Sequence, residues 1–153
     1  MKNGFTLIEL VVVIAVITVL SGIILFTVAQ YINRGKDSNI SGNLAVLIPA
    51  GEVYYNSNGS SGYLGFCGST VVSNAILQMP ANTNSCATGN SAPPNNAAGI
   101  CCYVKSTNDA WVAYAKEFTN SSNIYCVDSR GVKKDTPGSS SNITTIVSAF
   151  QCP

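Results

Sequence analysis

An apolar run near the start of the chain, residues 5–29, constrains the fold more than any other feature. As a helix rising about 1.5 Å per residue, these 25 residues would be roughly 37 Å long, which exceeds the hydrocarbon core of a bilayer, about 30 Å. Glu9 is the only ionisable residue in the run. A lone strand could not satisfy its backbone hydrogen bonds in lipid, whereas a helix can. The run is therefore predicted to be a transmembrane helix.

The pattern becomes amphipathic over residues 30–55. Apolar side chains recur there on one helical face, after a polar opening. The residues on this face are Ile40, Leu44, Leu47, Tyr54 and Tyr55. The periodicity predicts that the helix continues out of the membrane and covers a small sheet with this stripe. Pro49 is expected to kink the helix or to end it early.

Residues 56–153 have the composition of a loop-rich globular β domain. Asn, Ser, Thr and Gly are frequent there, and loops are expected at 56–66 and at 80–99. Two further segments, 70–78 and 143–150, are each expected to be a short helix or a strand.

Runs rich in apolar and aromatic residues predict the strands. The expected strands are 100–105, 110–118 and 123–128. A turn is expected at 129–131, and Lys133 and Lys134 beyond it are expected in a solvated loop. Trp111 and Tyr114 are expected to pack in the core or across strands. Together these segments predict an α+β fold, in which the second half of the long helix packs on an antiparallel sheet of three to five strands.

Six cysteines follow the apolar run. They are Cys67, Cys86, Cys101, Cys102, Cys126 and Cys152. An even number in a loop-rich, exported region predicts a disulfide framework. The sequence contains no Cys-x-x-Cys pair and no His, which argues against a zinc site. Because adjacent residues of a strand point to opposite faces, Cys101 and Cys102 are predicted to bond to different partners.

Charge and composition argue against nucleic-acid binding and catalysis. Eight basic and seven acidic side chains give no basic surface for phosphate contacts. Histidine, the commonest general base, is absent. The acids after the helix show no catalytic spacing and are too sparse for a calcium site; they are Asp37, Glu52, Asp109, Glu117, Asp128 and Asp135. Neither an enzymatic activity, nor a cofactor or metal, nor a nucleic-acid partner is expected.

A short polar leader ending in Gly4 precedes the string Phe5-Thr6-Leu7-Ile8-Glu9. This N-terminus, over roughly residues 1–31, resembles the class III signal sequence of type IV prepilins and pseudopilins. The resemblance implies that a membrane prepilin peptidase cleaves between Gly4 and Phe5 and methylates the new Phe5 amine. It also implies that Glu9 acts in assembly, where it would neutralise the Phe5 amine of a neighbouring subunit and set the axial register of a filament.

By this resemblance the chain divides into four parts: a leader at 1–4, a transmembrane and assembly helix at 5–29, its amphipathic continuation at 30–55, and the globular domain at 56–153. The subunit is expected in the bacterial inner membrane with its N-terminus inside, and later in an extracellular filament. Its expected partners are further copies and related pilins, the prepilin peptidase, the inner-membrane assembly platform and, before assembly, membrane lipid. Two residues depart from the family pattern: Phe26 stands at the position of a frequent proline, and Thr18 at that of a frequent glycine.

Several functions remain open at this point. Within the family, the chain is a fibre-forming pilin for adhesion or motility, a minor pilin in DNA uptake, or a pseudopilin of type II secretion. The region closed by Cys126 and Cys152 resembles the C-terminal disulfide loop of surface pilins, which favours a fibre. Outside the family, Thr27-Val28-Ala29 passes as a secretory cleavage site that would release a disulfide-rich domain. The four-residue leader and the interruption by Glu9 argue against that reading.

Overall fold

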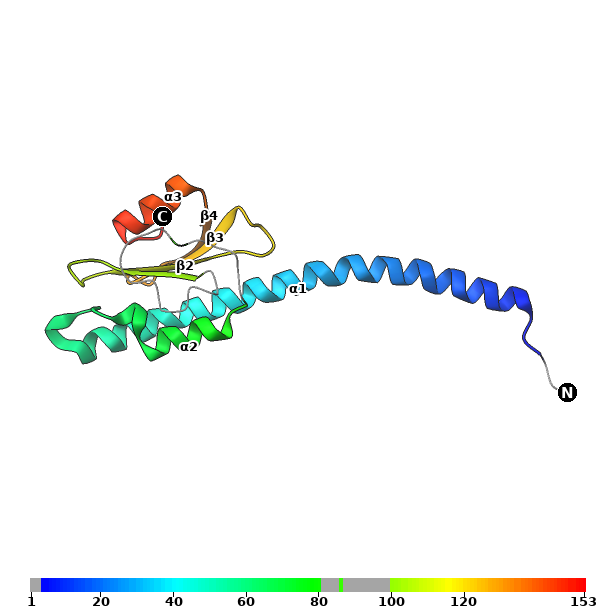
Figure 1. Ribbon diagram of the computed structural model, residues 1–153, viewed down its shortest axis with the longest axis horizontal. Helices are drawn as coiled ribbons and strands as arrows, with labels where there is room; N and C mark the ends of the chain where they lie inside the picture. The colour runs from blue at the N-terminus through cyan, green and yellow to red at the C-terminus, as the bar shows by residue number, and fades with distance from the viewer. Residues whose placement is uncertain (1–3, 81–85, 87–99) are drawn as a thin grey trace.

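The computed structural model describes residues 4–80, 86 and 100–153, apart from the side chain of Phe26. A long helix, α1, extends from a compact head in which a sheet lies between helices (Figure 1). Most of the loop expected at 80–99 lies outside the described residues, and so does most of the expected leader.

Helix α1 runs from Leu7 to Asn58 without interruption, over 52 residues. The prediction that Pro49 would end the helix early is wrong: the helix continues past Pro49 and ends three residues beyond the expected boundary at 55. Pro49 lies on the exposed side of α1, while Leu47 and Gly51 on either side of it are buried against the head. Because packing holds both flanking turns, it offsets the one backbone hydrogen bond that proline cannot donate.

Four antiparallel strands form one sheet in sequential order: β1 (Ile100–Val104), β2 (Trp111–Lys116), β3 (Asn123–Asp128) and β4 (Lys133–Pro137). The first three confirm the predicted strands within a few residues. The solvated loop expected around Lys133 and Lys134 is wrong, because both residues belong to β4, opposite Val127 and Cys126 of β3. Their charge suits an edge strand that faces solvent, where lysine discourages pairing with other chains.

Two short helices complete the head. Segment 70–78 is helix α2 (Thr70–Gln78), and Ser69 caps it by accepting a hydrogen bond from the backbone N–H of Val72. The C-terminal segment contains helix α3 (Ser140–Ala149), which Ser139 caps in the same way through the N–H of Asn142. In both segments the sequence left helix and strand open, and the structure has helix.

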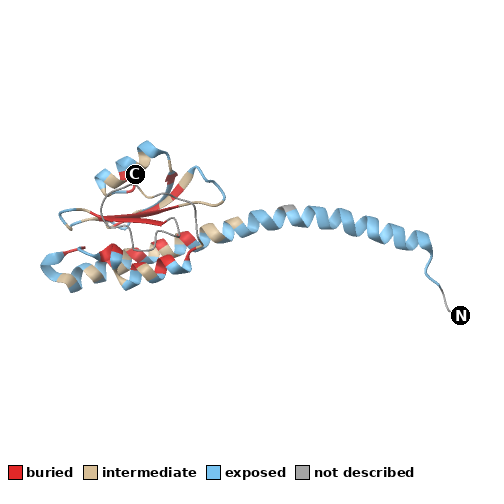
Figure 2. Ribbon diagram, viewed as in Figure 1, coloured by how far each residue is buried: buried red, intermediate tan, exposed pale blue. Residues whose placement is uncertain are grey.

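The sheet buries side chains on both faces, so the head has three layers (Figure 2). One face packs on α1 and α2 and the other packs under α3. Alternation along β3 divides its side chains accordingly: Val127 and Tyr125 face α1, whereas Ile124 and Cys126 face α3. The predicted α+β fold, with a long apolar helix on a four-stranded antiparallel sheet, is confirmed.

The predicted stripe of α1 is partly confirmed. Ile40, Leu44 and Leu47 are fully buried against the sheet, and Tyr54 packs at the edge of the same core. Tyr55 is 41% exposed and so lies outside the core, although its ring lies 4.8 Å from that of Tyr63. Tyr55 departs because it follows Tyr54 directly: a step of about 100° turns it away from the face that meets the sheet.

Trp111 anchors β2 to α1. Its ring is completely buried, 5.0 Å from that of Phe66. A Cβ atom at Gly51 of α1 would lie 2.7 Å from the indole nitrogen of Trp111, so only glycine lets the helix backbone approach the ring this closely. Tyr114 on the same strand is also fully buried, which confirms that both aromatic residues pack in the interior.

Candidate assembly helix and processing site

The first half of α1 makes no contact with the head, and its apolar side chains face outward all round (Figure 2). Phe5, Leu7 and Leu25 are 82%, 80% and 74% exposed. Within the described residues, this is the one helix that is long and apolar enough to cross a membrane. A surface this apolar needs lipid or another protein to cover it.

The Gly4–Phe5 junction lies just outside the helix. Neither residue belongs to a helix or strand, both are exposed, and a Cβ added to Gly4 would meet nothing within 4 Å. A protease needs an extended, accessible backbone, and the absence of a side chain at Gly4 leaves the bond open from that side.

Thr6 and Glu9 form a capping box that starts α1. The Glu9 carboxylate oxygen Oε2 accepts from the backbone N–H and from the hydroxyl of Thr6, both at 2.8 Å. The Glu9 N–H in turn donates to Thr6 Oγ1 at 3.4 Å. The carboxylate therefore points back toward the start of the helix rather than outward. The pattern Thr-x-x-Glu before an apolar run is the sequence signal for this cap, and the prediction of Glu9 as an assembly residue had not used it.

All six cysteines are paired in three disulfides. The pairs are Cys67–Cys102, Cys86–Cys101 and Cys126–Cys152. Cys102 belongs to the core against α1 and Cys101 to the core under α3, so the prediction that these neighbours bond to different partners is confirmed. The disulfides fix both faces of β1 and join β3 to the end of the chain.

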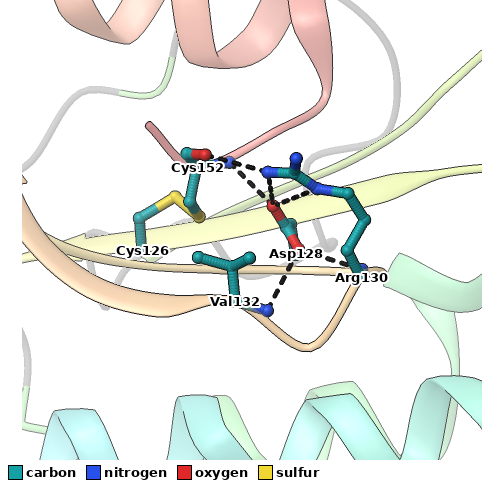
Figure 3. The surroundings of a disulfide bond; sticks show 5 residues. All are labelled: Cys126, Asp128, Arg130, Val132 and Cys152. Carbon is teal, nitrogen blue, oxygen red and sulfur yellow. Dashed lines mark hydrogen bonds and ion pairs between the residues drawn. A yellow bond between two sulfur atoms is a disulfide. The ribbon is translucent and has the colours of Figure 1, made fainter.

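A buried carboxylate closes the C-terminal region beside the third disulfide (Figure 3). Asp128 is fully buried, and its Oδ2 accepts from the Arg130 guanidinium at 2.7 Å and from the Cys152 N–H at 2.9 Å. Its Oδ1 accepts from the N–H of Arg130 at 2.9 Å and from that of Val132 at 3.3 Å. Arg130 also donates to the Cys152 carbonyl, at 2.9 Å. These bonds hold the β3–β4 turn and the chain end together.

Sequence reasoning missed this role of Asp128. Local signals show an acidic residue followed by a turn, but the partner at Cys152 lies 24 residues away. Only the folded chain brings the two together. In the described residues, no three His, Cys, Asp or Glu side chains are grouped in a way that would hold a metal ion.

The comparisons with known proteins support the reading of the N-terminus. Residues 1–25 match the family model described as the prokaryotic N-terminal methylation motif. The searches of curated proteins and of solved structures gave no match. The motif, the long apolar helix and the antiparallel sheet behind it define a structural, non-enzymatic subunit carrying a class III signal. In this motif and in the long helix and antiparallel sheet behind it, the chain is similar to the type IV pilins and pseudopilins.

A signal of this class implies processing by a prepilin peptidase and contact with pilus assembly machinery in general. Together with the apolar helix it indicates a membrane-anchored chain that later becomes extracellular.

Proposed function

We propose that this chain is a structural subunit of a type IV pilus, which is cleaved after Gly4 and polymerises through α1 into a surface filament for adhesion or motility. The observation that carries the proposal is the exposed apolar half of α1, which continues as one helix into a disulfide-bonded head. Before assembly lipid covers this surface, and in a filament the helices of neighbouring copies replace lipid. Burial changes little in that exchange, so assembly machinery must supply the work of extraction.

The Thr6–Glu9 cap supports a register role for Glu9. Cleavage after Gly4 would create a positive amine at Phe5, next to a carboxylate that already points toward the helix start. Both bonds from Thr6 use Oε2, so Oε1 can accept from an amine. A charge pair between the amine of one copy and Glu9 of the next would fix their axial offset.

The four parts of the chain follow from this proposal. Residues 1–4 are the leader and 5–29 the membrane and assembly helix, while 30–55 continue that helix into the head formed with 56–153. The N-terminus lies on the cytoplasmic side of the bacterial inner membrane, and the head lies outside. That orientation places all three disulfides in an oxidising compartment, where such bonds persist.

Two measurements test processing and register. N-terminal sequencing of the mature protein should give Phe5, whereas a start at Gln30 would mean secretory cleavage. Glu9→Ala subunits co-expressed with wild-type subunits should be depleted from filaments, with Glu9→Asp as a variant that keeps the charge. Incorporation of Glu9→Ala at the wild-type ratio would rule out the register role.

A pseudopilin of type II secretion, or a minor pilin in DNA uptake, is the alternative. The Cys126–Cys152 disulfide favours a fibre, because it closes the C-terminal region of the head in the manner of surface pilins. Electron microscopy of cells lacking the chain should show a loss of surface fibres. Intact fibres together with a defect in secretion or transformation would support the alternative instead.

A further inference from the structure

Three acidic side chains from separate parts of the fold line one pocket where α1 leaves the sheet. Asp37 comes from α1, Glu117 directly follows β2, and Asp135 belongs to β4. They line one pocket of about 390 Å³ together with Tyr125 of β3. The pocket therefore lies between the helix and the sheet, at the boundary of the head and the exposed apolar segment.

Asp37 joins α1 to the end of β2. Its Oδ1 accepts from the N–H of Phe118 at 2.6 Å, and its Oδ2 accepts from the N–H of Thr119 at 3.0 Å and from the Thr119 hydroxyl. Lys36 lies over the Phe118 ring, 4.6 Å from its centroid. These contacts link residues more than 80 positions apart, so this junction helps to fix how the helix meets the sheet.

Glu117, which is half-buried, and Asp135, which is exposed, both line this pocket, and Asp135 lies opposite Tyr125 on the face of the sheet that packs on α1. Two neighbouring carboxyl groups can hydrogen-bond to each other only when one of them carries a proton. Burial, followed by the bond to Asp135 and the charges of Asp135 and Asp37, raises the pKa of Glu117 to about 7. Burial and the charge of Asp135 also raise the pKa of the Tyr125 phenol.

Few charged groups on the surrounding elements face the pair. No lysine or arginine of the described residues lines the pocket. On α1, Arg34 is exposed and Lys36 covers Phe118. On β4, Lys133 is exposed, and Lys134 lies opposite Cys126 on the α3 side of the sheet. Lys116 of β2 lies opposite Ile124, also on the α3 side.

We propose that the Glu117–Asp135 pair is a proton-dependent clasp at the junction of α1 and the sheet, and that loss of its shared proton loosens this junction. With the proton present, the two side chains bond and the pocket holds at most two negative charges. Without it, three carboxylates repel one another around a pocket that lacks a lining cation. This repulsion would weaken the hydrogen bonds that Asp37 accepts from Phe118 and Thr119 at the edge of the pocket.

The sign of the pH dependence follows from the direction of the shift. Because the Glu117 pKa is raised above its usual value of 4.5 to about 7, the folded chain binds this proton more tightly than the unfolded chain does. The resulting stabilisation is full below pH 4.5 and is lost as the pH rises through about 7. The sequence contains no histidine, so no imidazole titrates in the same window.

The test uses the full chain in detergent micelles with its disulfides intact. The carboxyl carbon of Glu117, followed by NMR, should titrate with a midpoint near 7 rather than near 4.5. The urea midpoint of the wild-type head should fall between pH 5 and pH 8. Glu117→Gln, which mimics the protonated side chain, should lose this fall. Asp109→Asn should keep it, because Asp109 is an exposed acid outside the pocket.

Two results would overturn the clasp. One is a Glu117 carboxyl midpoint near 4.5 in the wild-type chain, a measurement that requires no variant to fold. The other is a Glu117→Gln chain whose urea midpoint falls with pH as steeply as that of the wild type. Asp135→Asn provides an independent check, because removal of the partner charge should lower the Glu117 midpoint and flatten the fall.

Discussion

At the scale of single residues, Asp128 is a buried carboxylate that accepts five hydrogen bonds. Its side chain is itself fully buried, and its two oxygens accept from Arg130, Val132 and Cys152. The Arg130 side chain is 46% exposed, so water can solvate its charge if Asp128 is removed, but the N–H groups of Val132 and Cys152 would lose their acceptor. Asp128→Ala is therefore expected to lower the free energy of unfolding by about 1–3 kcal/mol, the cost of a buried donor left without an acceptor, in urea titrations at pH 7.

Asp109 provides the matched control for that substitution. It is also an aspartate in an ion pair, with Lys105 at 3.0 Å, but this pair is exposed. Exposed pairs contribute little because water screens them. Asp109→Ala should leave the urea midpoint nearly unchanged, and an equal effect of the two substitutions would mean that Asp128 does not hold the chain end.

At the scale of elements, two glycines of α1 differ in why the helix has glycine: Gly51 packs closely on the sheet, whereas Gly42 has open space around it. A Cβ at Gly51 would lie 2.7 Å from the Trp111 indole, whereas a Cβ at Gly42 would meet nothing within 4 Å. Gly51→Ala is expected to destabilise the head by about 1–3 kcal/mol through overpacking. Gly42→Ala should instead stabilise it by about 0.5–1 kcal/mol, since alanine favours a helix. Thermal unfolding of both variants tests this contrast: the midpoint temperature should fall for Gly51→Ala and rise for Gly42→Ala. A raised midpoint for Gly51→Ala would show that α1 can move away from β2.

The elements also show what the sequence could and could not predict. The long apolar run and three strands were predictable from their local composition, and the stripe through Leu44 and Leu47 from its helical period. β4 was missed because Lys133, Lys134 and Asp135 have low strand propensity and pair only because β3 lies beside them. α1 continues past Pro49 because the flanking turns pack against the head. Rules based on local sequence do not include such packing.

The candidate processing and assembly residues, the disulfides and the buried carboxylates also divide into features set by local sequence and features set by the tertiary fold. Gly4, Phe5 and Glu9 could be predicted as processing and assembly residues because one contiguous string contains them. The different partners of Cys101 and Cys102 followed from the alternation of a strand, but their identities, Cys86 and Cys67, did not. The contacts of Asp128 with Cys152, and of Asp37 with Thr119, join positions far apart in the chain. Only the tertiary fold determines them.

At the scale of the whole molecule, the three disulfides connect segments that the sheet alone would leave loosely attached. Cys67–Cys102 ties the region before α2 to β1, and Cys126–Cys152 ties the chain end to β3. Each disulfide is expected to contribute about 2–4 kcal/mol. Reduction should therefore make the head sensitive to protease at concentrations that leave the oxidised protein intact, as gel electrophoresis would show. Unchanged resistance after verified loss of all three bonds would mean that the two cores suffice.

The unbroken course of α1 has a mechanical consequence. α1 curves along its length (Figure 1), and its 52 residues correspond to roughly 78 Å of helix, so a tilt of about 10° at one end displaces the other by roughly 13 Å. The same rod is embedded at its N-terminal end and carries the sheet at its C-terminal end, with no loop between them to act as a hinge. A sideways force applied near Phe5 would therefore rotate α1 and the head together.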